Sequence, residues 1–100
     1  VKPAVPFLCR NYDYPPHRVS RHDGDITWKL WEVARATSAA PSYFDPFERE
    51  GQQHMDGGVV ANNPSGIAFH EARKIWGPSV PISLFLSVGT GCPFSQPVPK

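Results

Sequence analysis

One aspartate in this sequence stands where a carboxylate could act as a base. Asp56 is followed directly by Gly57 and Gly58, so no side chain on that flank obstructs a group that approaches it. The segment Asn62-Asn63-Pro64 comes next and predicts a helix start that would fix the loop. This pattern is typical of a catalytic carboxylate held on a turn. A second interpretation stays open, because Asp before Gly is also common where a carboxylate accepts hydrogen bonds from turn amides.

The four histidines offer a weaker route to catalysis. None of them stands in a recognisable Ser-His-Asp motif, and solvated or hydrogen-bonding roles are favoured: His17, His22, His54 and His70. His54 lies two residues before Asp56, which makes it the histidine whose substitution would be most informative.

The elements around Asp56 are predicted to alternate between strand and helix. Residues 4–9 and 82–88 are apolar runs that predict buried strands, the second being too short for a helix. Residues 28–38 carry apolar side chains at helical spacing, and either Asp25 or Thr27 can cap that helix. This order predicts an α/β fold with a parallel sheet.

A second helix is predicted after Asp56 by its start and stop signals. Asn63 is expected at the N-cap with Pro64 at the first helical position, and Gly77 is expected to end the helix. The stretch up to Gly24 and residues 42–53 are both expected to be loops.

The composition bounds the function classes. Ten Lys and Arg against nine Asp and Glu give a net charge of +1, so nucleic-acid binding has little support. The longest apolar run is far shorter than the ~20 residues that span a bilayer. A 100-residue chain with 40% hydrophobic residues can form a core, but it would be marginal without neighbouring elements. Because the chain opens at Val1, we expect an interior or C-terminal stretch of a longer protein.

Three blocks of sequence together resemble one known family. The blocks are ARATSAAPSYF at residues 34–44, DGGVVANNP at 56–64 and SVGTG at 87–91. Their order and spacing are similar to the C-terminal half of a patatin-like phospholipase domain. The resemblance implies a three-layer α/β/α fold with a mainly parallel sheet. Residues 1–91 would be the C-terminal portion of that domain, and residues 92–100 a proline-rich exit linker.

The resemblance also implies a mechanism. Such enzymes use a Ser-Asp dyad to hydrolyse lipid acyl esters, and Asp56 matches the general base that accepts the proton of the serine. Gly57 and Gly58 complete the family's motif, in which the third position is Gly or Ala. The segment Asn62-Asn63-Pro64 would brace the loop around the aspartate. Because a fully solvated carboxylate is a weak base for a hydroxyl, placement and partial desolvation must supply the activation.

This sequence departs from the family pattern in the nucleophile. No serine has glycines at both the −2 and +2 positions, so the GxSxG elbow is absent, as is the glycine-rich oxyanion segment. We therefore expect a fragment of a lipid acyl hydrolase that is inactive alone, with its serine in an attached upstream half of the domain.

The expected partners are a lipid acyl-ester substrate and, transiently, a membrane surface. No cofactor or metal is expected, and a cytoplasmic or peripheral membrane location is favoured. Two alternatives remain: a non-catalytic scaffold or interaction module derived from the family, and a generic α/β ligand-binding domain in which Asp56 has no catalytic role.

Overall fold

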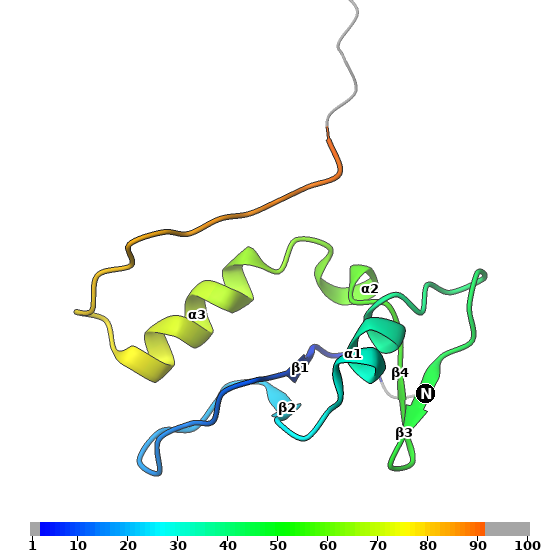
Figure 1. Cartoon of the computed structure of the whole chain (residues 1–100), viewed down its shortest axis with the longest axis horizontal. Helices are drawn as coiled ribbons and strands as arrows, with labels where there is room; N and C mark the ends of the chain where they lie inside the picture. Colours follow the sequence, from blue (N-terminus) through cyan, green and yellow to red (C-terminus); the bar gives the residue numbers. More distant parts are fainter. Residues whose placement is uncertain (1–2, 92–100) are drawn as a thin grey trace, which may run out of the picture.

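The computed structural model describes residues 3–91 and contains short strands and three helices (Figure 1). The elements follow one another in this order: β1 (Phe7–Cys9), β2 (Asp23–Asp25), α1 (Leu30–Thr37), β3 (Phe47–Arg49), β4 (Gln52–His54), α2 (Gly58–Ala61) and α3 (Ser65–Trp76). This mixture of helices and strands agrees with the predicted α/β class. The predicted exit linker, residues 92–100, lies outside the described residues.

Strands β1 and β2 form a parallel pair, in which Leu8 lies opposite Gly24. The amide of Arg10 extends the pairing by donating to the carbonyl of Asp25 at 2.9 Å. The sequence predicted the first strand within residues 4–9, but the prediction of loop up to Gly24 was wrong for the last two residues. Gly24 has no room for a side chain, because a Cβ there would collide with the backbone carbonyl of Leu8 and the guanidinium of Arg10.

Helix α1 falls within the predicted range, but its N-cap is Lys29 and not one of the two predicted capping residues. Asp25 uses its carboxylate in its own turn, where Oδ1 accepts from the Thr27 amide at 2.9 Å. The helix start is stabilised instead by Glu32, whose carboxylate accepts from the Lys29 amide at 2.8 Å. The prediction that Asp25 or Thr27 caps the helix was therefore wrong.

A β-hairpin replaces the loop predicted for residues 42–53. Strands β3 and β4 pair antiparallel, with Arg49 opposite Gln52, so the turn contains only two residues. These residues are Glu50 and Gly51, with φ of 51° and 74°. Two consecutive positive φ values are the signature of the tight turn that matches strand twist, and a glycine supplies one of them without strain.

The second long helix begins and ends close to its predicted signals. Helix α3 starts at Ser65, and the side chain of Asn63 accepts a hydrogen bond from the Ser65 amide at 3.1 Å. Pro64 directly precedes the helix, and its carbonyl accepts the Ala68 amide at 2.9 Å. Gly77 ends the helix with φ of 93°, and its amide donates to Arg73. The prediction of Asn63 as the N-cap was wrong by one residue, because Pro64 is the N-cap and Asn63 acts just before it.

The predicted strand at residues 82–88 is absent from the structure. These residues run back along α3 without strand pairing (Figure 1). Phe85 packs against Phe69 with ring centroids 6.0 Å apart, and the Ser87 hydroxyl lies 2.9 Å from that of Ser65. An apolar run becomes a strand only when a neighbour satisfies its amides and carbonyls, and residues 3–91 place none beside it.

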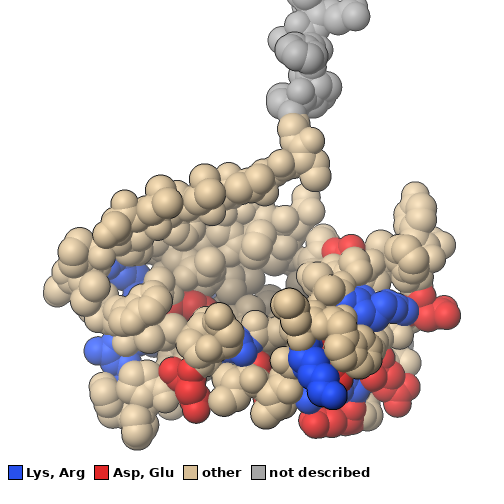
Figure 2. Space-filling view, in the orientation of Figure 1, with Lys and Arg blue, Asp and Glu red and all other residues tan. Residues whose placement is uncertain are grey.

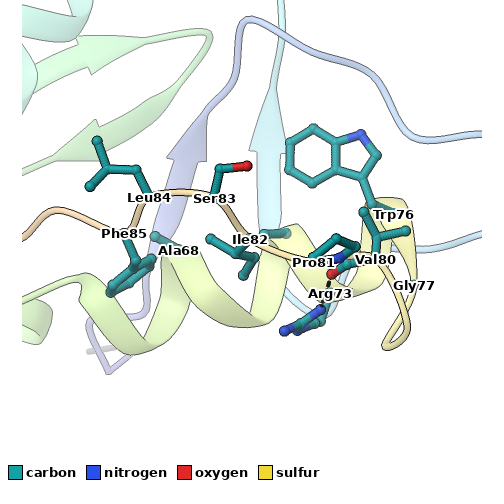
Figure 3. Close-up of a pocket in the computed structure, with 11 residues that line it drawn as sticks. Ala68, Arg73, Trp76, Gly77, Val80, Pro81, Ile82, Ser83, Leu84 and Phe85 are labelled. Carbon is teal, nitrogen blue, oxygen red and sulfur yellow. Dashed lines mark hydrogen bonds between the residues drawn. The ribbon is translucent and has the colours of Figure 1, made fainter.

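A groove about 480 Å³ in volume separates this segment from α3 (Figure 3). Its lining is largely apolar and includes Ala68, Trp76 and Ile82. The guanidinium of Arg73 reaches the groove but donates to the carbonyls of Pro78 and Val80. The guanidinium of Arg73 therefore holds the chain that follows α3 against the helix.

A buried ion pair joins the end of β1 to α3. The guanidinium of Arg10 and the carboxylate of Glu71 approach to 2.6 Å, with side-chain exposures of only 8% and 5%. Glu71 also accepts from the hydroxyl of Ser20 at 3.0 Å and from that of Tyr14. One carboxylate thus fixes the stretch of residues 10–20 against the middle of α3 at three side chains.

Little apolar surface is buried in the described part of the chain. The buried hydrophobic residues are Ala36 and Ala39, whereas Leu30 is 84% exposed and Val88 is 82% exposed. Charged side chains of both signs mix on the face below, but the segment after Lys74 carries none up to residue 91 (Figure 2). Within the described range, none of the helices has the length and apolar character needed to cross a bilayer.

Candidate active site

Asp56 lies in the turn between β4 and α2, where hydrogen bonds fix both its backbone and its carboxylate. Its amide donates to the carbonyl of Ala39 at 3.0 Å, just after α1. Its Oδ1 accepts from the amide of Gly58 at 2.7 Å. Asp56 is half-buried, and among residues 3–91 no donor binds its Oδ2. One carboxylate oxygen is thus held by the turn, while the other has no hydrogen-bond partner among the described residues.

The two glycines after Asp56 differ in how closely they are packed. A Cβ on Gly58 would lie 3.1 Å from Oδ1 of Asp56 and 3.5 Å from Oδ1 of Asn62. A Cβ on Gly57 would lie 3.8 Å from the Thr37 hydroxyl, an ordinary contact. Gly57 has φ of −57°, so the turn does not need the left-handed backbone region there. Gly58 is therefore the glycine that lets two side-chain oxygens approach the backbone.

The bracing segment predicted after the aspartate lies next to this turn. Asn62 follows α2 and brings its amide oxygen near Gly58, beside the Asp56 carboxylate. Asn63 and Pro64 serve the start of α3. The structure thus connects Asp56, α2 and α3 through consecutive short-range contacts, although it shows no direct hydrogen bond between Asn62 and Asp56 in the described residues.

An aromatic cluster includes His54, two residues before Asp56, and no sequence pattern predicted that its members would come together. Its members come from β1, the turn before α1, α1 and the hairpin: Phe7, Trp28, Trp31, Phe47 and His54. Burial, and then the charge of Arg49, hold the pKa of His54 below its usual range. His54 is therefore a neutral aromatic ring at neutral pH. The only sequence signal for this role was its position two residues before Asp56.

The other polar groups predicted as weak candidates lie elsewhere. The rings of His22 and His70 meet edge to face, with centroids 6.4 Å apart, and His17 is exposed. In the described range no serine or histidine side chain hydrogen-bonds Asp56, and no group of His, Cys, Asp and Glu could hold a metal ion. The groove beside α3 is lined by residues that do not include Asp56.

The arrangement around Asp56 suits proton acceptance. A carboxylate held by one backbone amide keeps its orientation, and its second oxygen can accept a proton from a hydroxyl brought within about 2.6–3.2 Å. The turn itself supplies no nucleophile.

Comparison with known proteins decides the family. A sequence profile described as patatin-like phospholipase matches residues 3–69. The chain belongs to the patatin-like phospholipase family. The match spans β1 through the first five residues of α3 and includes the whole Asp56 turn, which confirms the resemblance inferred from the three sequence blocks.

Several patatin-like relatives cover most of this chain. Calcium-independent phospholipase A2-gamma of Rattus norvegicus is 42% identical over 85% of the chain, and Phospholipase A I of Arabidopsis thaliana is 33% identical over 91%. The cGAMP-activated phospholipase of Vibrio cholerae is 51% identical over 59%. The chain spans 11%, 9% and 17% of these relatives. No solved structure matches this patatin-like chain.

Proposed function

We propose that this chain supplies the general-base aspartate of a Ser-Asp dyad that hydrolyses lipid acyl esters. The observation that carries the proposal is the Asp56 carboxylate, whose Oδ1 is held at 2.7 Å by the Gly58 amide while Oδ2 has no hydrogen-bond partner among the described residues, within a patatin-like phospholipase sequence. The relatives named as phospholipases support a lipid substrate.

The proposed chemistry needs a serine from outside residues 1–100. That hydroxyl would give its proton to Oδ2 of Asp56 as its oxygen attacks the acyl carbonyl, and the proton would then pass to the departing alkoxide. A water molecule would release the fatty acid by the same exchange of a proton with Asp56. Without the serine and an oxyanion hole the segment alone would be inactive, since each contributes a large factor in rate.

We further propose that residues 1–91 are the C-terminal portion of a three-layer α/β/α domain with a mainly parallel sheet, and that residues 92–100 form the exit linker. An attached upstream half would supply strands beside the apolar run 82–88. The exposure of Leu84 at 78% and Leu86 at 74% supports this proposal, because such a row of side chains is stable when covered on both faces.

The substrate we propose is a phospholipid or a neutral acyl ester at a membrane surface that the enzyme contacts transiently. The test is to incubate the full-length protein with phosphatidylcholine vesicles and to identify released fatty acid and lysolipid by mass spectrometry. Release of both products in equal amounts is expected. A folded full-length protein that releases neither from phospholipid nor from triacylglycerol would overturn the proposal in favour of the scaffold.

The close packing at Gly58 leads to a graded prediction. Gly58→Ala places a Cβ 3.1 Å from Asp56 Oδ1, which a shift of a few tenths of an ångström relieves. We expect hydrolysis to fall less than about tenfold, whereas the branched Gly58→Val should cost about 100-fold because it displaces the carboxylate by a larger distance. Gly66→Ala is the matched control, since nothing lies within 4 Å of a Cβ there. Equal activity of the Ala and Val variants would contradict this account.

A further inference from the structure

The imidazole of His54 is held between two aromatic rings from different parts of the chain. Its centroid lies 4.8 Å from that of Phe7 at an interplanar angle of 64°, and 4.8 Å from that of Trp28 at 90°. Edge-to-face contacts at this distance are favourable for aromatic pairs. The described residues show no hydrogen bond from this imidazole, so its contacts are made by the faces and edges of the rings.

The charge that acts on this ring is that of Arg49, which belongs to an ion-pair network. Arg49 of β3 lies over Trp28 with its guanidinium carbon 4.9 Å from the ring centroid. It pairs with Asp25 at 3.0 Å, and at 3.6 Å with Glu32 of α1 and with Glu50 in the hairpin turn. The Cys9 thiol of β1 is the remaining titratable group coupled to this network, and its pKa is raised mainly by burial. A cation on His54 would thus be partly desolvated and would face the like charge of Arg49.

The backbone of Asp56 is held by its own hydrogen bonds, its carbonyl accepting from the Val59 amide at 3.1 Å, and His54 is the nearest preceding residue with aromatic contacts. The amide of Asp56 itself is bound to Ala39. Met55, the residue between, is 41% exposed and contributes little burial. The chain that enters the Asp56 turn is therefore held both by the ring of His54 and by the backbone pairing of β4 with β3, in which His54 lies opposite Phe47.

We propose that His54 is a positioning residue for Asp56, its ring acting as an aromatic anchor between Phe7 and Trp28 that fixes the backbone presenting the carboxylate. This inference rests on the proposed role of Asp56 as the general base. It predicts that the shape of the ring matters more than its ability to exchange protons.

The experiment compares three substitutions at His54 in the full-length protein. His54→Ala removes the anchor, His54→Phe keeps an aromatic ring without a titratable group, and His54→Gln takes the place of the alanine variant if that one does not fold. His17→Ala is the matched control, because His17 is an exposed histidine in a loop. Two quantities are measured: the kcat and KM of phospholipid hydrolysis per folded protein, and hydrogen exchange of the amides of residues 56–61.

We expect His54→Ala to lower kcat by about 10- to 100-fold with little change in KM, because misplacing a catalytic group by about 1 Å costs that much. The same variant should exchange the residue 56–61 amides faster, since the Gly58 amide is bound to the Asp56 carboxylate. His54→Phe should restore both quantities to near the wild-type values. Wild-type kcat and exchange in His54→Ala, or failure of His54→Phe to restore them, would overturn the proposal.

The pH dependence of amide exchange, compared between the wild type and His54→Phe, separates anchoring by the His54 ring from a general loss of stability. Because the pKa of His54 is lowered in the folded protein, the stability that its neutral ring contributes is fully present above the usual histidine pKa of ~6.5 and is lost as the pH falls through the lowered value. The exchange of residues 56–61, corrected for intrinsic rates, should therefore accelerate on acidification in the wild type and much less in His54→Phe. Equal acceleration in both would contradict the anchor.

Failure of this inference is distinguishable from failure of the proposed function. Exchange of the Asp56 turn reports on the anchor whether or not hydrolysis is observed. If Asp56→Asn loses hydrolysis while His54→Ala has wild-type kcat and amide exchange, only the proposal that His54 positions Asp56 is overturned. If Asp56→Asn still hydrolyses the lipid, the proposal that Asp56 is the general base is overturned.

Discussion

Asp56→Asn in the full-length protein is expected to lower kcat/KM for phospholipid hydrolysis by about 10⁴-fold, the scale seen when an essential carboxylate becomes an amide. Asparagine keeps the shape of the side chain, and its Oδ1 can still accept the Gly58 amide. Its nitrogen, however, cannot take a proton from a serine hydroxyl. The fold and the affinity for lipid vesicles should therefore be unchanged while turnover is lost.

The matched control is Asp45→Asn. Asp45 is exposed, and the structure uses only its backbone carbonyl, which accepts from Arg35 at 2.9 Å. Fatty acid release, thermal melting and vesicle binding would be measured for both variants. Turnover of Asp56→Asn within about tenfold of the wild type, a loss far below that of an essential catalytic carboxylate, would remove Asp56 from the chemistry and favour the interpretation of Asp56 as a structural turn residue.

Glu71→Ala should produce the largest loss of stability among single substitutions in this part of the protein. It leaves the guanidinium of Arg10, 8% exposed, without its anionic partner and deprives Tyr14 and Ser20 of their acceptor. Removing one member of a buried ion pair typically costs about 3–5 kcal/mol of unfolding free energy. Urea denaturation of the full-length protein, followed by the unfolding of this domain, measures the effect.

A double variant tests whether the cost comes from the stranded charge. Arg10→Met combined with Glu71→Met removes both charges and fills similar volume, so it should be more stable than Glu71→Ala, with strongly non-additive effects. Glu48→Ala, an exposed carboxylate on β3, is expected to change stability by less than about 0.5 kcal/mol. A Glu71→Ala effect as small as that control would mean that the ion pair is not a stabilising contact.

Local signals predicted the parts of the fold that local interactions stabilise. Asn63 and Gly77 lie at the two ends of α3 and act through hydrogen bonds to residues within four positions, so the sequence pattern contains the whole interaction. The hairpin was missed although Glu50-Gly51 is a recognisable two-residue turn, because the flanking residues are polar and charged rather than alternating.

Long-range features could not be predicted from spacing. Arg10 and Glu71 are 61 residues apart, and nothing in either neighbourhood indicates the other. The Asp56 motif was located because glycines follow it directly, whereas its attachment to Ala39 and the ring of His54 depend on how α1 and β1 meet the hairpin. The prediction of a strand at residues 82–88 was wrong for the same reason, because strand pairing also requires a neighbouring strand, which the pattern of the run itself does not predict.

The absence of space at Gly24 links it to a residue far away in the sequence. Any side chain there meets Arg10, the residue that neutralises Glu71, as well as the carbonyl of Leu8. An inherited missense change at Gly24 would be judged benign from the exposed position of the residue. It would nevertheless have the same effect as a damaging substitution in α3. In deep mutational scans, substitutions at positions 24 and 71 should therefore be tolerated equally poorly.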